Sequence, residues 1–219
     1  MWDIKTLKET ISQNYQGNHS VFDYLESLDR SIDIFDYHKC EAYALFKEIE
    51  PKNQREAISF ILSRGEERAA LNDSTLILQA HLQSAFYNVR SMYEIYAQLI
   101  NELILEPKIQ VHDCSIARVV KRLKTDIPND PLTVLTEQVC SNESNTYVES
   151  FINTIKHRNL LKTQRMLKVQ EGNVGVLIRD FKYRGNVYPE KWFLEALEDG
   201  VTARNNIIDL GQALNEKLA

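Results

Sequence analysis

The stretch STLILQAHLQSAFYNVRSMYEIYAQLINELI, residues 74–104, decides the fold class of this chain. Its apolar residues recur at alternating steps of four and three, which is the spacing of one face of an α-helix. They are Leu78, Leu82, Ala85, Val89, Met92, Tyr96, Leu99 and Leu103, with a second row of Phe86, Tyr93 and Ile100. A helix that is apolar over so wide an arc is packed on two sides. The sequence therefore predicts a bundle around this helix, which would be roughly 45 Å long at about 1.5 Å per residue.

Further helices are predicted on both sides of this stretch. Apolar residues at helical spacing predict them at residues 2–14, 21–49 and 53–71, and again at residues 115–125, 131–140 and 147–159. Asp73 or Ser74 is expected to cap the start of the central helix. Thr146 and Glu149 have the spacing of a capping box, which places the start of the last of these helices at Tyr147.

The pattern changes in the last third of the chain. β-branched runs at residues 165–171 and 174–183 flank a Glu-Gly-Asn turn, and they predict a β-hairpin within residues 161–188. Residues 189–219 then predict a C-terminal helix that Pro189 opens. We therefore expect a mainly α fold: a helical bundle around one long central helix, with a small β-hairpin before the C-terminal helix.

Composition and charge limit the classes of function. The chain has 219 residues and a net charge of −5, so a contact with nucleic acid must be local and cannot spread over a general basic surface. The N-terminus has no secretory signal pattern, and no stretch approaches the ~18 consecutive apolar residues of a membrane span, so we expect no membrane partner. Three separated cysteines, Cys40, Cys114 and Cys140, predict no disulfide framework and favour a reducing cytoplasm. The sequence shows no Gly-rich phosphate loop, no GxSxG motif and no paired histidines for zinc, so no metal or cofactor is expected.

The stretch FINTIKHRNLLKTQ, residues 151–164, contains the candidate functional residues. On a helical wheel, Asn153, Lys156 and His157 share one face, whereas Arg158 lies on the opposite flank unless the helix end unwinds. The wheel assigns the buried face to Val148, Phe151, Ile152, Ile155 and Asn159.

This basic helix end has two interpretations. It is an anion or RNA site, to which Arg179, Lys182 and Arg184 of the hairpin would add a basic finger. Alternatively it is an ordinary helix end, because cations in a last turn are favoured by the helix macrodipole by about 0.3–1 kcal/mol without any ligand.

The order of these patterns resembles a known superfamily. The segment HLQSAFYNVRSMYEIYAQLINELIL, followed by two short helices and a helix that ends in FINTIKHRNLL, resembles bacterial branches of the HEPN superfamily. The resemblance covers about residues 73–164. It implies an all-α bundle that forms a homodimer and acts on RNA, as a toxin or defence protein with a cognate protein partner.

The resemblance also implies roles for individual residues. His157 would act as general acid and base, and Lys156, or Arg158 from a partner chain, would hold a phosphate. Asn153 would orient the histidine or the 2′-hydroxyl of RNA. Active HEPN ribonucleases carry an arginine and then a histidine with four to six residues between them, and no arginine precedes His157 at that distance. The cleavage of RNA would therefore be atypical.

We expect one domain over residues 1–219, in which the resemblance defines the core. It has N-terminal helices at 1–72, an HEPN-like core at 73–160, the hairpin at 161–188 and the C-terminal helix at 189–219. The expected function is binding of RNA or a nucleotide, or an atypical ribonuclease activity. The alternative is a non-catalytic helical interaction, scaffold or regulatory protein.

Overall fold

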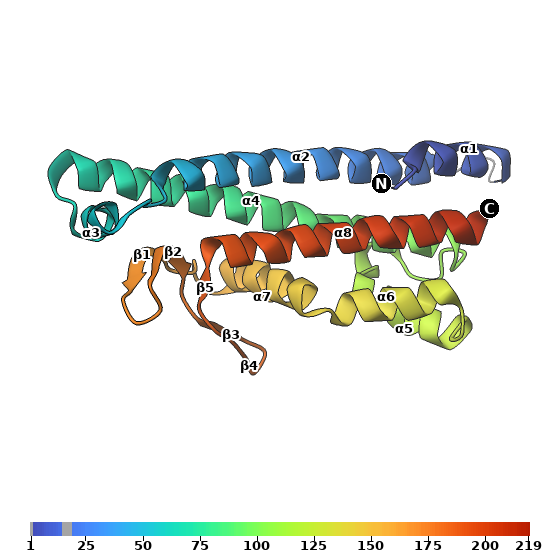
Figure 1. The fold of residues 1–219 in the computed structure, drawn as a ribbon. Coiled ribbons are helices and arrows are strands. Elements are labelled where there is room, and N and C mark those ends of the chain that lie inside the picture. Colours follow the sequence, from blue (N-terminus) through green and yellow to red (C-terminus); the bar gives the residue numbers. More distant parts are fainter. Residues whose placement is uncertain (1, 15–18) are drawn as a thin grey trace.

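The computed structural model describes residues 2–14 and 19–219. It is mainly α, as the sequence predicted (Figure 1). The helices are α1 (Ile4–Asn14), α2 (His19–Ile49), α3 (Gln54–Leu62), α4 (Gly65–Leu103), α5 (Ile116–Asp126), α6 (Pro131–Ser141), α7 (Glu143–His157) and α8 (Phe193–Leu218), with a 3-10 turn η1 at Val111–Asp113. The strands are β1 (Thr163–Lys168), β2 (Asn173–Ile178), β3 (Phe181–Tyr183), β4 (Asn186–Tyr188) and β5 (Lys191–Trp192).

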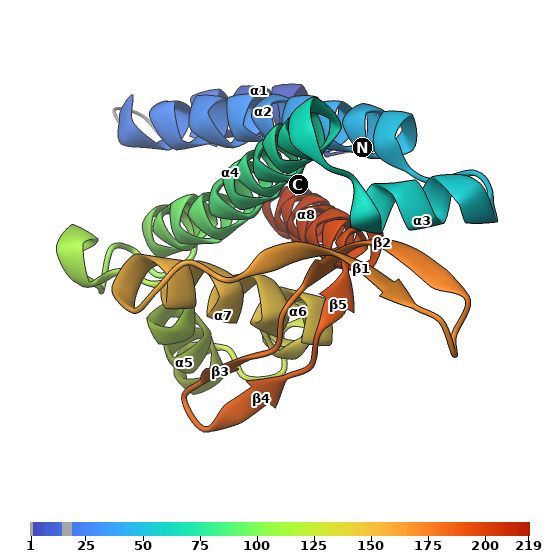
Figure 2. The same cartoon turned by 90° about the vertical axis from the view of Figure 1, so that its left-hand side faces the viewer.

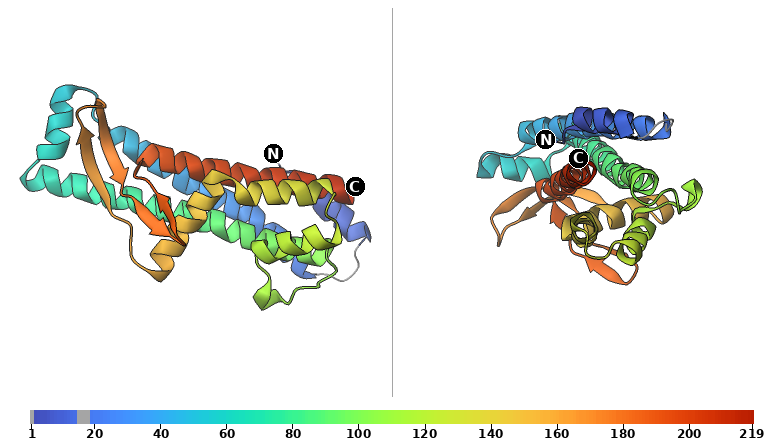
Figure 3. Two further views of the ribbon diagram at one scale, coloured as in Figure 1. Left: turned by 90° about the horizontal axis from the view of Figure 1, so that it is seen from below. Right: turned by 90° about the vertical axis from the view of Figure 1, so that its right-hand side faces the viewer.

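Helix α4 is the central helix of the bundle. Helices α2 and α8 lie along it, and the shorter helices α5, α6 and α7 cover the remaining side (Figures 1 and 3). Both apolar rows of the predicted stretch are buried. The hydroxyl groups of Tyr93 and Tyr96 donate hydrogen bonds to the carbonyl oxygens of Ala203 and Leu210 in α8, at 3.0 and 3.1 Å. The two-sided packing of this helix is therefore confirmed.

The central helix begins nine residues before the predicted start. It runs from Gly65 through Asp73 and Ser74, so the prediction that one of these two residues caps it was wrong. Residues 66–71 are Glu, Arg, Ala and Leu, which are good helix formers, and they carry the helix through the polar residues. The Ser74 hydroxyl donates to the carbonyl oxygen of Ala70 at 3.0 Å, so its side chain is satisfied inside the helix.

The segment that precedes α1 approaches α8 closely at a glycine. A Cβ atom added at Gly211 would lie 2.0 Å from Cδ2 of Trp2, so the indole ring lies directly against the backbone of α8. The indole nitrogen of Trp2 donates to Oδ1 of Asn215 at 3.0 Å, and the ring is 5% exposed. This contact fixes α1 on the C-terminal half of α8.

The strand region holds two hairpins instead of one. Strand β1 pairs antiparallel with β2, from Thr163 opposite Ile178 to Lys168 opposite Asn173, and β5 adds to the other edge of β2 (Figure 2). The predicted strand 174–183 is divided between β2 and β3. Strands β3 and β4 form a second hairpin whose two loop residues, Arg184 and Gly185, both have positive φ, as a type I′ turn requires.

Two predicted helix starts also differ from the structure. Helix α7 begins at Glu143 because Asn142 caps it, with its side-chain oxygen accepting from the backbone of Ser144 at 3.0 Å. Helix α8 begins only at Phe193 because residues 191–192 extend the sheet. Across the described ranges, no helix has the length and apolar composition needed to cross a membrane.

Candidate functional site

The predicted site residues lie where α7 ends. Lys156 and His157 occupy the last turn, and Arg158 is the C-cap, with φ −132° and ψ −78°. Val148, Phe151 and Ile152 are buried as predicted, and Ile155 is half-buried. Asn159 is exposed, so its assignment to the buried face was wrong. The helical wheel fails there because the helix has already ended.

Arg158 turns away from the helix toward the second hairpin. Its guanidinium donates to the carbonyl oxygen of Lys182 at 2.8 Å, which joins the end of α7 to β3. The same guanidinium lies 5.4 Å from the ring centre of Tyr183, and that of Arg184 lies 5.2 Å from this ring. Two cations are thus placed around one half-buried tyrosine.

Lys156 contacts a different element. Its ammonium group lies 5.7 Å from the ring centre of Tyr87 on α4, a side chain that is 49% exposed. Asn153 is half-buried and His157 is exposed, and neither side chain has a hydrogen bond or ion pair with any residue that the structure describes. The four predicted residues therefore lie at one helix end, and their side chains do not contact one another.

The positive charge at this end is not neutralised by neighbouring carboxylates. Five exposed cations carry no ion pair within the described residues, and we call them the basic end: Lys156, Arg158, Lys162, Lys182 and Arg184. Sequence reasoning missed Lys162, although its position between α7 and β1 was visible in the sequence. Arg179 does not belong to this set, because it pairs with Glu190 at 3.3 Å and with Asp180 at 3.6 Å.

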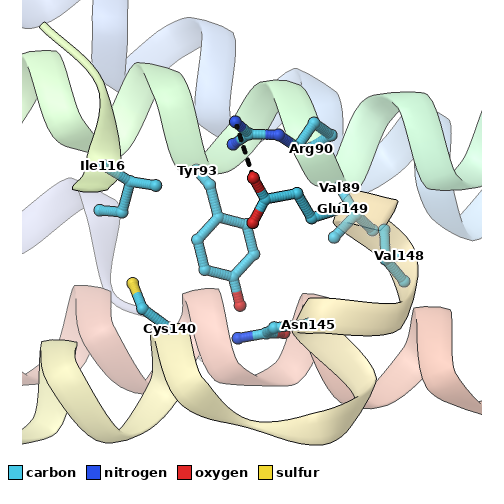
Figure 4. A pocket seen from close by; sticks show the side chains of 8 residues that line it. All are labelled: Val89, Arg90, Tyr93, Ile116, Cys140, Asn145, Val148 and Glu149. Carbon is cyan, nitrogen blue, oxygen red and sulfur yellow. Dashed lines mark ion pairs between the residues drawn. The ribbon is translucent and has the colours of Figure 1, made fainter. Parts of the chain in front are cut away.

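A small interior cavity lies between α4, α5, α6 and α7 (Figure 4). Its volume of about 30 Å³ holds one or two water molecules and no larger ligand. Arg90 spans its rim and pairs with Glu94 at 2.5 Å and with Glu149 at 3.8 Å. Burial, followed by the charge of Glu149, raises the pKa of the Cys140 thiol in its wall to about 12. This thiol is protonated at neutral pH, so the cavity offers neither a substrate site nor a nucleophile.

Comparison with known proteins leaves the identity of the chain open. No family model, no curated protein and no solved structure matches it. The resemblance to the HEPN superfamily therefore stays a prediction that depends on the residues quoted above.

Proposed function

We propose that this protein binds RNA at the basic end. The observation that carries the proposal is the group of five cations without carboxylate partners, three of which contact the ring of Tyr87 or Tyr183, in a chain of net charge −5. Lysine and arginine contact the phosphates of a nucleic acid, and exposed aromatic rings or guanidinium planes stack on unpaired bases. Both kinds of group are present here within elements that contact each other.

The helix macrodipole alone does not account for this charge. Its favourable effect is confined to the last turn of a helix, which here contains Lys156 and His157. The other cations lie beyond the helix end, in the segment before β1 and in the β3–β4 hairpin. Elsewhere in the described residues, some exposed cations such as Lys124 and Lys108 pair with carboxylates at 2.5 and 2.9 Å, whereas others such as Lys5 and Lys121 have no ion pair. The basic end places five unpaired cations on the end of α7, the segment that follows it and the β3–β4 hairpin that contacts it, so one anionic ligand would neutralise several of them together.

Binding and cleavage make different demands on the site. Binding needs only the charges and rings, whereas cleavage also needs one group that takes a proton and one that gives it back. His157 is an exposed imidazole without a side-chain partner among the described residues, so one chain supplies one such group. The cleavage that the HEPN resemblance implies would need a second chain to complete the site.

The test measures binding of a labelled single-stranded RNA and of tRNA by fluorescence anisotropy over about 50–200 mM salt. The triple variant Lys156→Ala, Arg158→Ala, Arg184→Ala is compared with Lys5→Ala, a change to another exposed cation, on α1 at the opposite end of the bundle (Figure 1). Each phosphate contact that is lost should reduce the slope of log affinity against log salt by about 0.7 for a single strand. The triple variant should therefore lose about two units of slope, and the control should lose none.

A flat salt dependence, or an equal loss in the Lys5 control, would contradict the proposal. RNA cleavage that disappears in His157→Ala while binding is kept would assign a ribonuclease activity. Binding without cleavage in both proteins would assign RNA binding alone.

A second function, a non-catalytic interaction protein, is favoured by exposed apolar residues on α2 and α4. Tyr37 and Tyr43 on α2 are 58% and 51% exposed, and Leu76 and Ile77 on α4 are 65% and 46% exposed. Exposed apolar groups of this size mark protein interfaces when they are contiguous. Light scattering at micromolar concentration tests the simplest case, the homodimer that the HEPN resemblance implies. A monomer there, together with an absence of RNA binding, would favour a different protein partner.

A further inference from the structure

Two histidines that are far apart in the sequence meet between α2 and α4. Nδ1 of His38 lies 3.0 Å from Nδ1 of His81, and the two ring centres are 5.2 Å apart. Both side chains are half-buried. Since 43 residues separate them, no local spacing in the sequence indicates the pair.

The two nitrogens point at each other. A ring centre lies about 1.15 Å from its Nδ1, so a centre separation of 5.2 Å with a nitrogen separation of 3.0 Å requires a nearly head-on arrangement. In the metal-free protein, one Nδ1–H donates to the other Nδ1.

We propose that His38 and His81 together bind a divalent transition metal ion, for which Zn²⁺ is the probe. A tetrahedral Zn²⁺ at about 2.05 Å from two imidazole nitrogens separates those nitrogens by roughly 3.3 Å and the ring centres by roughly 5.2 Å. The observed ring centres already have this separation. Binding therefore requires each ring to turn by roughly 35° about its own centre. Both Nδ1 atoms then face one metal position, which lies beside the line that joins the two ring centres.

The two imidazoles are the only protein ligands that the described residues offer at this site. No third His, Cys, Asp or Glu joins the pair within the described residues, so water would complete the coordination of the ion. Asp36, the carboxylate two residues before His38, is held by Lys39 at 2.6 Å and by Arg204 at 2.8 Å. The ring of Tyr37 contacts both imidazoles edge-on, with ring centres 5.2 and 6.4 Å away, and covers one side of the pair.

The proposed ion would connect the two longest helices of the bundle. Helices α2 and α4 share the most extensive contact in the fold, and the ion would cross-link them near the middle of α2. It uses none of the residues of the basic end, so this site is independent of the proposed RNA binding.

The experiment titrates ZnCl₂ into the full-length protein in competition with a chromophoric zinc indicator. His38→Gln and His81→Gln are compared with His112→Gln, a change to a histidine whose side chain is 75% exposed on η1. Wild type and His112→Gln should bind one equivalent of zinc, and each of the other two variants should bind it at least about tenfold more weakly. Equal binding by all four proteins, or no binding by wild type, would overturn the proposal.

A second measurement does not depend on folding of the variants. Zinc is added to wild-type protein, and the imidazole nitrogens are followed by NMR. The proposal requires the Nδ1 signals of two histidines, His38 and His81, to shift together at one equivalent of zinc. Neither of these signals should shift when RNA is added instead. A shift confined to His112 or His157 would show surface binding only and would overturn the proposal.

Discussion

Replacing Gly211 by alanine should destabilise the protein, although alanine is the better helix former. The new methyl carbon would lie 2.0 Å from Cδ2 and 2.3 Å from Cε2 of Trp2. Ordinary carbon contacts are about 3.5–4.0 Å, so the indole must move by roughly 1.5–2 Å. That movement breaks its hydrogen bond to Asn215 and opens the buried site that the ring fills.

The two opposing effects can be compared directly. Losing a buried tryptophan from its site costs about 3–5 kcal/mol, whereas alanine in place of glycine inside a helix gains about 1 kcal/mol. Gly211→Ala should therefore lower the free energy of unfolding by about 2–4 kcal/mol, which corresponds to a fall in Tm of roughly 5–15 °C for a chain of this length.

A double-mutant cycle tests the reasoning, with urea unfolding followed by far-UV circular dichroism. In a Trp2→Ala background the clash is gone, so Gly211→Ala should raise the free energy of unfolding, by up to about 1 kcal/mol. The sign of the effect should thus reverse between the two backgrounds. A neutral effect in wild type, or the same loss in both backgrounds, would refute the packing of Trp2 on Gly211.

Three further predictions concern single side chains. The hydroxyl of Tyr147 is buried without a hydrogen-bond partner in the described residues, whereas the hydroxyl of Tyr96 donates to the carbonyl oxygen of Leu210. In urea unfolding, Tyr147→Phe should therefore change the free energy of unfolding by less than about 0.5 kcal/mol, and Tyr96→Phe should lower it by about 1 kcal/mol. Iodoacetamide at pH 8 should label the exposed Cys40 first and Cys140 at least about 1,000-fold more slowly, because burial raises the pKa of Cys140 to about 12. Mass spectrometry of the native protein measures the two rates. Equal labelling of both thiols would contradict this prediction. A hydrogen bond from Lys217 lowers the pKa of Asp130, the N-cap of α6. The stability that the Asp130 carboxylate contributes is therefore complete above the pKa of about 3.9 in the unfolded chain, and it disappears as the pH falls through the lower pKa of the folded state. Asp130→Asn should reduce the loss of stability below about pH 5, as measured by urea unfolding at a series of pH values.

The sequence predicted most of the helices because burial imposes their spacing directly. The two apolar rows of residues 74–104 have no other arrangement that buries them, and α4 buries both. Its true start was missed because Asp73 and Ser74 are residues that cap helices, whereas in the structure the helix runs through both and the Ser74 hydroxyl bonds to the carbonyl oxygen of Ala70. The strands of the second hairpin have three residues each, which is too short for an alternating pattern to be recognised.

The candidate site was predictable only as far as it is local. The position of Lys156 and His157 in a last turn follows from the sequence, whereas the direction of Arg158 is set by backbone angles that leave the helix. Its contact with Lys182 joins segments 24 residues apart, and the pairing of His38 with His81 joins two separate helices. No periodicity encodes contacts of this kind, because they depend on how complete elements pack.

The position of α4 between α2 and α8 has a consequence for the nascent chain. One neighbour of α4 is made before it, but the other begins about 90 residues after it ends, which corresponds to roughly 5–20 seconds of translation at the ribosome. During that interval α8 does not yet cover the face of α4 that carries the hydroxyls of Tyr93 and Tyr96. An exposed apolar surface of this length is a substrate for chaperones, so expression without them should yield aggregates that form before residues 193–218 emerge from the exit tunnel.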